Sequence, residues 1–452
     1  MKWKLLTLFT CVLLLAVFSI PAVTHNAFLP VVADSPKGDS TGWRVQADNA
    51  VGFSLICTAN ESYLYVGGAM LTDTTWKYAL WKYNSSGVNI WNTTINITGY
   101  STNGFSKLAL SPDEGAIYAV GMIQNGSQYD GILVKFNTSD GGYLWNYTLS
   151  GPSYDRLYGV AVSPDGEIVY TSGMLSKSTN MYGNTSFYVA ALNSTDGNNI
   201  WEYEIHESGQ WGYSQDLTVS PTRNEVYAVG YYYISGAYTK LVALNATDGS
   251  PLWNISSSLY YLIYSVKVSL DGNVMYVMVP SYYAGSFLTI STSNGSILGN
   301  ITLDGASYPF SFDISPDKSK IFTTALSLAY PYGYIITAKY DFVSGALTGV
   351  LTAPDDRTHC YDVVASNNNE SVYVAGLYSN GITGETYMFL LKDKPRPLTS
   401  PLTLLLPYYY IISSQSPILS TPMNSIFLGA VIATLLVVAG FLVSKILRGR
   451  VS

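Results

Sequence analysis

Acidic, basic and aromatic side chains gather in short segments that could bind a ligand. Arginine follows aspartate twice, at Asp155-Arg156 and at Asp356-Arg357, and a guanidinium presents a planar fork of donors that matches a carboxylate. Tryptophan and tyrosine add flat faces for sugars or apolar side chains. The candidate ligand-binding residues are Asp155, Arg156, Glu207, Trp211, Tyr308, Asp356, Arg357 and His359. The alternative is that the Asp–Arg pairs only tie neighbouring loops, since exposed ion pairs are common and contribute little.

Few residues suited to catalysis or metal binding accompany these segments. The three histidines are His25, His206 and His359. The sequence has neither an HExxH motif nor a cysteine–histidine zinc cluster, and the spacing does not assemble a Ser/His/Asp triad. Calcium is one ion that turn carboxylates such as Asp140, Asp196 and Asp248 could hold, although each also suits a simple turn. No catalytic residue and no cofactor is therefore predicted, with calcium as the alternative.

The composition excludes nucleic acid as a partner and favours β-structure. Charged residues make up 12% of the chain and the formal net charge is −7, so there is no basic field to attract a polyanion. Tyrosine is abundant, with 39 residues, and aromatic and β-branched side chains with scattered Gly, Asn and Asp suit strands joined by tight turns. We therefore expect an all-β chain.

The two ends of the chain differ from the rest and predict export and a membrane anchor. Residues 1–27 begin with two lysines and continue into an apolar run, as a secretory signal peptide does; an uncleaved anchor is the alternative. Residues 425–444 form an apolar segment of the length of a transmembrane helix. The basic residues of the tail, 445–452, favour the cytoplasmic side. The expected protein is a type I, single-pass protein of the plasma membrane with residues 42–395 outside.

A segment rich in Pro, Ser and Thr, residues 396–424, is expected to form an extended stalk before this anchor. Within it, residues 402–412 are unusually apolar but too short to span a membrane. They suit either the membrane interface or packing against the preceding domain.

Glycosylation sequons agree with an extracellular location. Fourteen of the 27 asparagines precede x-Ser/Thr, whereas about five or six would do so by chance. The candidate glycosylation sites are Asn60, Asn84, Asn92, Asn96, Asn125, Asn137, Asn146, Asn184, Asn193, Asn245, Asn254, Asn294, Asn300 and Asn369. Asn, Ser and Thr also crowd turns, which is the alternative explanation.

A repeat with a period near fifty residues organises the region between the two ends. Each copy opens with an apolar alternation, a turn such as Ser-Pro-Asp-Gly, and a second strand that carries an aromatic marker. The seven markers are Tyr65, Tyr118, Tyr170, Tyr227, Tyr276, Phe322 and Tyr373. A second hairpin follows in most copies, as in LVALNATDGSPLW at 241–253. Four strands per copy, stacked radially seven times, predict a seven-bladed β-propeller over residues 42–395.

The second hairpin resembles the PQQ-type repeat, whose pattern is Ala-x-Asp-x-x-Thr-Gly-x-x-x-Trp. Ala243, Gly249 and Trp253 match it at the right spacing, and so do the equivalent residues of the preceding copy. The first hairpin resembles YVTN-type and WD40-like repeats. The combination of signal, sequon-rich propeller and C-terminal anchor is similar to archaeal membrane-anchored surface proteins. The PQQ dehydrogenases, which these repeats resemble, show an adjacent cysteine pair and acidic calcium ligands. No Cys-Cys pair is present in this sequence.

The ring should close through its N-terminal segment. The seventh copy lacks a fourth strand, and residues 42–46, Gly-Trp-Arg-Val-Gln, resemble the fourth strands of other blades. If these residues complete the seventh blade, no sheet edge is left open at the joint. Trp43 should then lie beside the strand near 386–391 and pack as Trp145, Trp201 and Trp253 do.

Closure makes Cys57 and Cys360 neighbours in the ring, in the first and seventh copies. Exported proteins can form disulfides, so a bond is one alternative. The two residues are offset by five positions on equivalent strands, about 16 Å, which exceeds the roughly 7 Å that a disulfide allows. Two unpaired, buried thiols are the other alternative.

These features predict a cell-surface binding or structural module for adhesion, envelope assembly or ligand capture, with a surface protein or carbohydrate as partner. The alternative is an extracellular enzyme of oxidoreductase or lyase type on the same ring. Turns between the first and second strands and between the third and fourth share one face, where several sequons fall. The opposite face carries longer and more varied loops, with sequons at Asn125 and Asn184, and loops on a rigid scaffold commonly bind.

Overall fold

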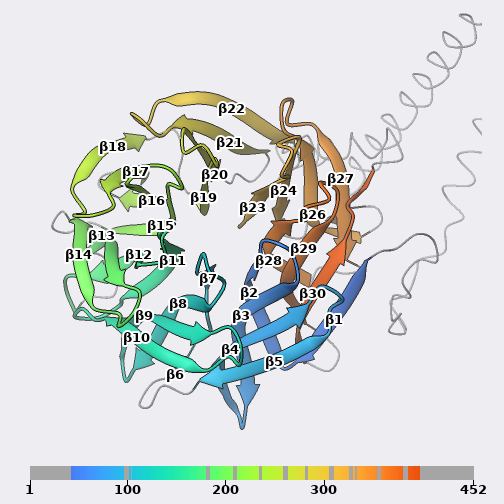
Figure 1. Ribbon diagram of the computed structural model, residues 1–452, viewed down its shortest axis with the longest axis horizontal. Helices are drawn as coiled ribbons and strands as arrows, with labels where there is room; N and C mark the ends of the chain where they lie inside the picture. The colour runs from blue at the N-terminus through green and yellow to red at the C-terminus, as the bar shows by residue number, and fades with distance from the viewer. Residues whose placement is uncertain are drawn as a thin grey trace, which may run out of the picture. The chain divides into compact units, whose positions relative to one another are not determined.

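Seven antiparallel β-sheets stand as blades around a central axis in the computed structural model of the chain (Figure 1). The structure describes residues 42–95, 101–102, 104–179, 184–206, 211–233, 237–257, 263–279, 284–304, 310–324, 329–330, 333–353, 358–379 and 385–397. The prediction of an all-β, seven-bladed propeller is confirmed.

Each blade consists of four strands that run in sequence from the axis outward. Blade 1 comprises β2 (Ala50–Cys57), β3 (Tyr63–Thr72), β4 (Thr75–Asn84) and β5 (Asn89–Ile95). Blade 2 comprises β7 (Lys107–Leu110), β8 (Ala116–Asn125), β9 (Gln128–Asn137) and β10 (Tyr143–Leu149), with β6 (Ser101–Thr102) also beside β8. Blade 3 comprises β11 (Arg156–Val162), β12 (Ile168–Ser176), β13 (Thr185–Asn193) and β14 (Asn199–Ile205). Blade 4 comprises β15 (Trp211–Val219), β16 (Glu225–Tyr233), β17 (Ala237–Asn245) and β18 (Pro251–Ser257).

The remaining three blades follow the same plan with additions at the end of the chain. Blade 5 comprises β19 (Ser265–Val268), β20 (Val274–Val279), β21 (Ala284–Ser291) and β22 (Ile297–Asp304). Blade 6 comprises β23 (Phe312–Ile314), β24 (Lys320–Thr324), β26 (Gly333–Asp341) and β27 (Leu347–Ala353), with β25 (Ala329–Tyr330) beside β26 and β31 (Arg396–Pro397) beside β27. Blade 7 comprises β28 (Thr358–Ala365), β29 (Val372–Ser379), β30 (Thr386–Asp393) and β1 (Trp43–Asp48).

The Ser-Pro-Asp-Gly turns are stabilised by their own side chains, which form hydrogen bonds within the turn where strand pairing ends. In blade 3 the Asp165 carboxylate accepts hydrogen bonds from the Ser163 hydroxyl at 2.5 Å and from the Glu167 N–H at 3.0 Å. Gly166 has a φ of +79°, the left-handed conformation that glycine adopts without steric cost. The same two bonds recur at the equivalent turns of blades 2, 5 and 6, so these turns are stabilised by residues of their own repeat.

The hydrophobic core lies in the seams between blades rather than at the centre of the ring. One cluster joins Tyr170 and Trp201 of blade 3 to Leu217 and Val226 of blade 4, and all four side chains are buried. Equivalent clusters fill the other seams. Every blade is therefore stabilised by apolar burial against its two neighbours.

The glycine and the tryptophan of the repeat meet across a seam. Trp201 on the outer strand of blade 3 donates its Nε1–H to the Ala246 carbonyl of blade 4 at 3.0 Å. Its ring also lies against Gly249, where an added Cβ would come within 2.6 Å of the ring. The equivalent tryptophans, at positions 91, 145 and 253, make the same bond at 2.8–3.2 Å. We call this Trp–Gly contact the seam clasp.

The N-terminal strand closes the ring as predicted. β1 pairs with β30 in antiparallel register, with Trp43 opposite Lys392. The Trp43 Nε1–H donates to the Ser85 carbonyl of blade 1 at 2.9 Å, and a Cβ on Gly87 would come within 2.6 Å of the Trp43 ring. The closing strand thus reproduces the seam clasp of the other blades.

A carboxylate adds a second contact at this closing seam. Glu61, in the first turn of blade 1, accepts hydrogen bonds from the Asn367 N–H, from the Ser366 hydroxyl at 3.0 Å and from the Tyr373 hydroxyl at 2.8 Å. Lys392 lies 3.6 Å from the same carboxylate. Burial alone would raise the pKa of Glu61, but these donors and the lysine outweigh it and hold the pKa below its ordinary value.

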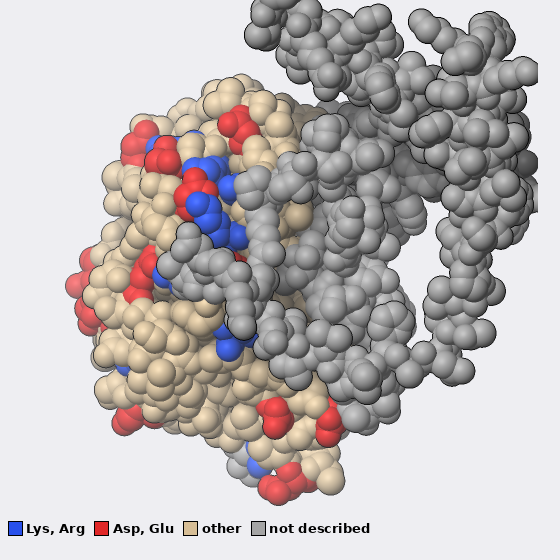
Figure 2. Space-filling model, turned by 90° about the vertical axis from the view of Figure 1, so that its right-hand side faces the viewer, with Lys and Arg blue, Asp and Glu red and all other residues tan. Residues whose placement is uncertain are grey.

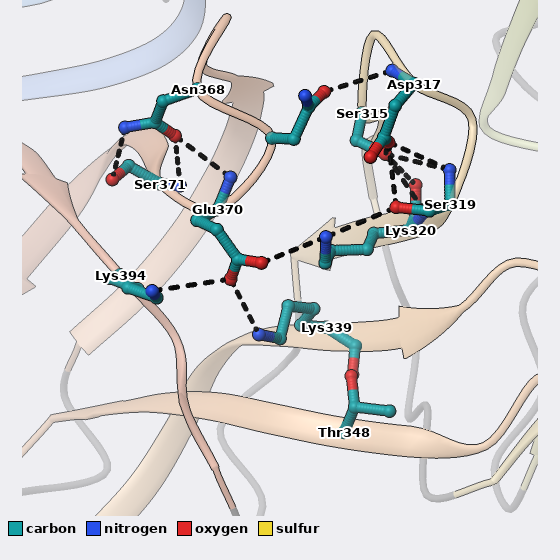
Figure 3. A network of polar contacts seen from close by, with 11 residues as sticks. Ser315, Asp317, Ser319, Lys320, Lys339, Thr348, Asn368, Glu370, Ser371 and Lys394 are labelled. Carbon is teal, nitrogen blue, oxygen red and sulfur yellow. Dashed lines mark hydrogen bonds and ion pairs between the residues drawn. The ribbon is translucent and has the colours of Figure 1, made fainter.

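Three lysines converge on one carboxylate at the seam between blades 6 and 7 (Figure 3). Glu370 lies 3.0 Å from Lys320, 3.4 Å from Lys339 and 3.6 Å from Lys394. Lys394 belongs to the segment that leaves β30, and that segment continues into β31 at the outer edge of blade 6. The first two residues of the predicted stalk are therefore part of a sheet.

The two cysteines of blades 1 and 7 are unpaired, as their strand offset predicts. Cys360 is buried, whereas Cys57 is half-buried rather than buried. Burial, with smaller effects of nearby carboxylates, raises the pKa of Cys57 to about 12. Burial likewise raises the pKa of Cys360. Both thiols are therefore poor nucleophiles at neutral pH.

Several predicted segments lie outside the described residues. They are the signal peptide at 1–27, the stalk beyond residue 397, the transmembrane segment at 425–444 and the tail at 445–452. Within the described ranges, no helix has the length and apolar character needed to cross a membrane.

Replacing Trp43 tests the closing clasp. Trp43→Ala removes the bond to Ser85 and the ring contact with Gly87, and should lower the free energy of unfolding by about 2–3 kcal/mol, as for a half-buried tryptophan. Urea denaturation followed by circular dichroism measures the change. Ile90→Ala, which truncates a side chain that is 49% exposed on β5, is the control and should change stability by less than about 1 kcal/mol. Equal effects of the two substitutions would contradict a closing role for Trp43.

Acid should weaken the same seam through Glu61. Because its folded pKa lies below the ordinary 4.5, the carboxylate stabilises the fold fully above pH 4.5, and this stabilisation is lost as the pH falls through the folded pKa. The free energy of unfolding, measured by urea denaturation from pH 7 to pH 3, should fall more steeply in the wild type than in Glu61→Gln. Parallel curves for the two proteins would show that Glu61 does not contribute to acid sensitivity.

Candidate functional site

A pocket of about 390 Å³ lies at one mouth of the central axis. Every blade contributes to its wall, and one lining residue of each blade, in or just before the first strand, occupies the same position in the repeat. These seven residues, which we call the collar, are Phe53, Ser106, Tyr158, Gln215, Tyr264, Phe310 and Tyr361. Pockets that hold small ligands are commonly of this size and largely aromatic, with a few polar groups.

Irregular pairing in the first strands explains how collar side chains reach the pocket. The register of the first strand shifts in blades 1, 3, 4 and 7, between Gly52 and Ser54 in blade 1 for example. In each case the residue skipped by the shift is the collar residue: Phe53, Tyr158, Gln215 or Tyr361. A β-bulge leaves one residue unpaired and redirects its side chain. The bulges therefore place the collar.

Most of the collar is a continuous arc of rings. Ring centroids are 5.1 Å apart for Phe53 and Tyr361, 6.0 Å for Tyr361 and Phe310, and 5.5 Å for Phe310 and Tyr264. Tyr158, on the other side of the arc, lies 5.6 Å from Tyr213. These separations are those of favourable aromatic pairs. The collar is thus largely aromatic, with Ser106 and Gln215 as its polar members.

Arg156 adds a positive charge to this wall. It lies two residues before Tyr158 on β11, and its guanidinium carbon sits 4.8 Å from the centre of the Tyr158 ring. Its Nε is buried without a hydrogen-bond partner, and within the described part of the chain the guanidinium makes no ion pair. A buried donor without a partner is costly. Arg156 is therefore the group in the pocket with the most to gain from an anionic ligand.

The other charges near the axis are already paired or saturated. Lys107 lies 2.8 Å from Asp216, two blades away, and Lys267 lies 2.7 Å from Asp313. In blade 3, which lies between Lys107 and Asp216, Gly159 occupies the position equivalent to Lys107 in the repeat. A Cβ added to Gly159 would come within 3.1 Å of Asp216. Burial lowers the pKa of Lys267, but the carboxylates around it, with Asp313 first, raise it more.

Three aspartates near the axis bind the first strand of the following blade. Asp216 accepts the N–H of Val266 at 3.1 Å. Asp313 accepts the N–H of Ala365 at 2.8 Å, and Asp362 accepts the N–H of Leu55 at 2.8 Å. Asp362, which also lines the pocket, accepts further bonds from the hydroxyls of Ser54 and Ser311. These carboxylates hold the ring together, so they explain most of the acidic charge at the axis without a ligand.

The structure separates the neighbouring candidates Asp155 and Arg156. Arg156 lines the pocket, whereas Asp155 is fully buried. The Asp155 carboxylate accepts the N–H groups of Gly151 and Ser176, each at 2.6 Å, and the Ser176 hydroxyl at 3.0 Å. Burial raises its pKa although these bonds oppose the shift. Asp155 therefore ties a loop through the backbone and forms no pair with Arg156.

Of the remaining candidates, the two that the structure describes, Trp211 and His359, do not line the pocket. Trp211 is 45% exposed, donates to the Met174 sulfur at 3.3 Å, and lies 5.8 Å from the Tyr213 ring. His359 is half-buried on β28 and does not line the pocket. The candidates Glu207, Tyr308, Asp356 and Arg357 fall outside the described residues.

Sequence reasoning missed Phe53, Tyr264 and Tyr361, together with Lys107 and Asp362. The signal was present in the repeat: every collar residue stands five positions before the residue that opens the first turn, Ser111 in blade 2 for example. That column is aromatic in five of the seven repeats.

The described residues offer little for a metal or for a quinone cofactor. In the ranges that the structure describes, no group of three or more His, Cys, Asp or Glu side chains is placed to hold a metal. The carboxylates of Asp140, Asp196 and Asp248 each accept the N–H two residues further on, at 2.9–3.0 Å. The adjacent cysteine pair of PQQ dehydrogenases has no counterpart, so the residues present do not fit that cofactor.

The pocket opens on the face opposite the hairpin turns. In blade 2 the Thr138 N–H of the second turn donates to the Gly115 carbonyl of the first turn at 3.1 Å, and other blades repeat this bond. The two kinds of turn therefore share a face, as predicted. The collar stands at the other end of the first strands. On the side of the ring that carries β27, β30 and β1, the described surface is mostly uncharged, with basic and acidic atoms in small mixed groups (Figure 2).

Three solved structures are similar to this chain, and the first of them agrees with this architecture. The hydrazine synthase of Kuenenia stuttgartiensis is similar in structure with a TM-score of 0.50 and 10% identity, covering 75% of this chain and 94% of that chain. Sqt1 of Chaetomium thermophilum has a TM-score of 0.47 and 14% identity, covering 76% and 95%. A putative 6-phosphogluconolactonase of Bacteroides uniformis has a TM-score of 0.42 and 13% identity, covering 67% and 85%. Identities this low concern the fold alone.

No curated protein sequence matches the chain. A family model does: PQQ_2, described as outer membrane protein assembly factor BamB, matches residues 30–300. That range is more than half of the chain and holds the four tryptophan-bearing hairpins whose glycines and tryptophans form the seam clasps. The chain therefore belongs to the PQQ_2 family of β-propeller repeat proteins.

Proposed function

We propose that the protein is a binding module of the cell surface that captures its ligand in the collar pocket. The observation that carries the proposal is the pocket itself, in which aromatic rings from five blades surround a guanidinium without a partner among the described residues. A stack of rings gives contact area, and a buried cation gives orientation. The rest of the ring holds these groups in place.

Rigidity around the pocket supports a binding role. The collar residues stand on strands that hydrogen-bond within their own blade, and the axial aspartates join those strands between blades. A site whose side chains are held before the ligand arrives loses less conformational entropy on binding.

Display outside the cell is supported by the sequence and by where its sequons fall. The exposed asparagines at positions 92, 146, 254 and 300 lie at equivalent places on the outer strands of their blades. Sugars there, and on the face of the hairpin turns, would leave the collar mouth open. A C-terminal anchor behind residues 396–424 would hold the propeller at the membrane surface.

Substitution of a collar tyrosine tests the binding role. The full chain in detergent micelles is screened against a glycan array, a peptide library and a panel of small organic acids. Tyr361→Ala removes a ring that touches both Phe53 and Phe310, so it should weaken the binding of any true ligand about tenfold. Tyr143→Ala is the matched control, because Tyr143 is 53% exposed on the outer strand of blade 2. Failure of all three ligand classes, or a ligand indifferent to Tyr361→Ala, would contradict the proposal.

Surface display has its own test. Intact cells that produce the protein are treated with a membrane-impermeant amine-reactive biotin, and captured chains are examined before and after removal of Asn-linked sugars. Propeller lysines such as Lys177, which is 31% exposed, should be labelled in intact cells, and deglycosylation should lower the mass. Labelling that requires cell lysis would contradict an extracellular propeller.

A further inference from the structure

We infer that the collar pocket selects an acidic carbohydrate, whose carboxylate binds Arg156 while its ring lies against the aromatic collar. This inference rests on the proposed binding function and names the class of ligand. Its basis is the combination of one unpaired cation, a set of ring faces and a small number of polar groups within a single pocket.

The cation defines the charge of the ligand. The Arg156 guanidinium has five N–H donors and no acceptor, and its buried Nε makes no hydrogen bond. A carboxylate accepts two parallel bonds from such a fork, and charge-assisted bonds of this kind are the strong ones. The Tyr158 ring beneath the guanidinium holds it flat without consuming any donor.

The neighbouring carboxylates do not supply this partner. Asp216 is committed to Lys107 and to the Val266 N–H. Asp362 lines the same pocket, but its oxygens accept bonds from the Leu55 N–H and from two serine hydroxyls. Both acids are already bound to residues of other blades, so an acid brought by the ligand is the partner left for Arg156.

The collar defines the body of the ligand. The face of an aromatic ring is negative, so it attracts the C–H edges of a sugar ring. Ser106, Gln215 and Ser311 stand among the aromatic side chains and offer hydrogen-bond partners to hydroxyls. A wholly apolar acid would offer no hydrogen-bond partner to the Gln215 amide when it excluded water. A peptide that binds by strand addition needs a free sheet edge, whereas the collar presents side chains.

A path of rings leads from Arg156 to the rim and fits a ligand longer than one sugar. Tyr158 lies 5.6 Å from Tyr213, and Tyr213 lies 5.8 Å from Trp211. Trp211 is 45% exposed although it is held by the Met174 sulfur and by the Tyr231 ring. A second or third unit of the same oligosaccharide would pack on this outer part of the path.

The test compares one oligosaccharide with and without its charge. The probe is a tetrasaccharide with glucuronic acid at its non-reducing end, used as the free acid and as the methyl ester, and titrated calorimetrically into the full chain in detergent micelles. The free acid should bind the wild type about tenfold to a hundredfold more tightly than the ester. Arg156→Gln should abolish this difference, and Arg156→Lys, which keeps the charge without the fork, should restore only part of it. The preference should also weaken as salt rises.

Arg44→Gln is the matched control, since the Arg44 guanidinium also lies over a ring, that of Phe389 at 5.5 Å, but on the outer strand of blade 7. It should leave the preference for the acid intact, and thermal unfolding should show that all variants are folded. Equal binding of acid and ester by the wild type, or an unchanged preference in Arg156→Gln, would overturn the inference. Binding of a different ligand class that is lost in Tyr361→Ala would also overturn it while leaving the proposed function standing. Absence of any Tyr361-dependent ligand would overturn both.

Discussion

The pairing of β1 with β30 joins the first described strand of the propeller to one of its last, and every other feature of the ring depends on it. A four-stranded blade buries its faces only against neighbours, so an open array would expose one core surface at each end. Closure removes both surfaces at once and leaves the seventh blade as complete as the others. The Trp43 clasp and the Glu61 contacts then hold this seam by the two kinds of force found around the ring, apolar packing and charge-assisted hydrogen bonding.

The same strands that build the ring also build the pocket. Aspartates at the start of the first strands fasten one blade to the next, while the bulged residue beside them is turned into the mouth. One short stretch of backbone thus provides both cohesion and a binding surface. Because the charges of these strands hold the ring together, charge at the axis is almost fully paired. Among the described residues, the unpaired guanidinium of Arg156 is therefore conspicuous there.

The fold could be predicted because its determinants are local and are repeated. Each copy carries its own turn, its own aromatic marker and its own glycine, and Trp43 could be assigned to blade 7 because it imitates Trp145. The pocket was harder to predict. Asp155 and Arg156 are adjacent, yet one is buried and the other lines the mouth, because neighbouring residues at a strand start point in opposite directions. Phe53 and Tyr361 belong to no motif, and the bulges that redirect them leave no clear mark in a single copy.

The attachment of β31 to blade 6 determines how mechanical load would enter the propeller. A pull on the chain beyond residue 397 meets β31, which is hydrogen-bonded to β27, and then Lys394, which is held by Glu370. Tension is therefore divided between blades 6 and 7 before it reaches β30. The load therefore does not pull β30 and β1 apart directly from one end, which is the geometry in which the hydrogen bonds of paired strands break one at a time. Load applied beyond residue 397 would therefore strain β31 and the Lys394–Glu370 contact before the ring could open.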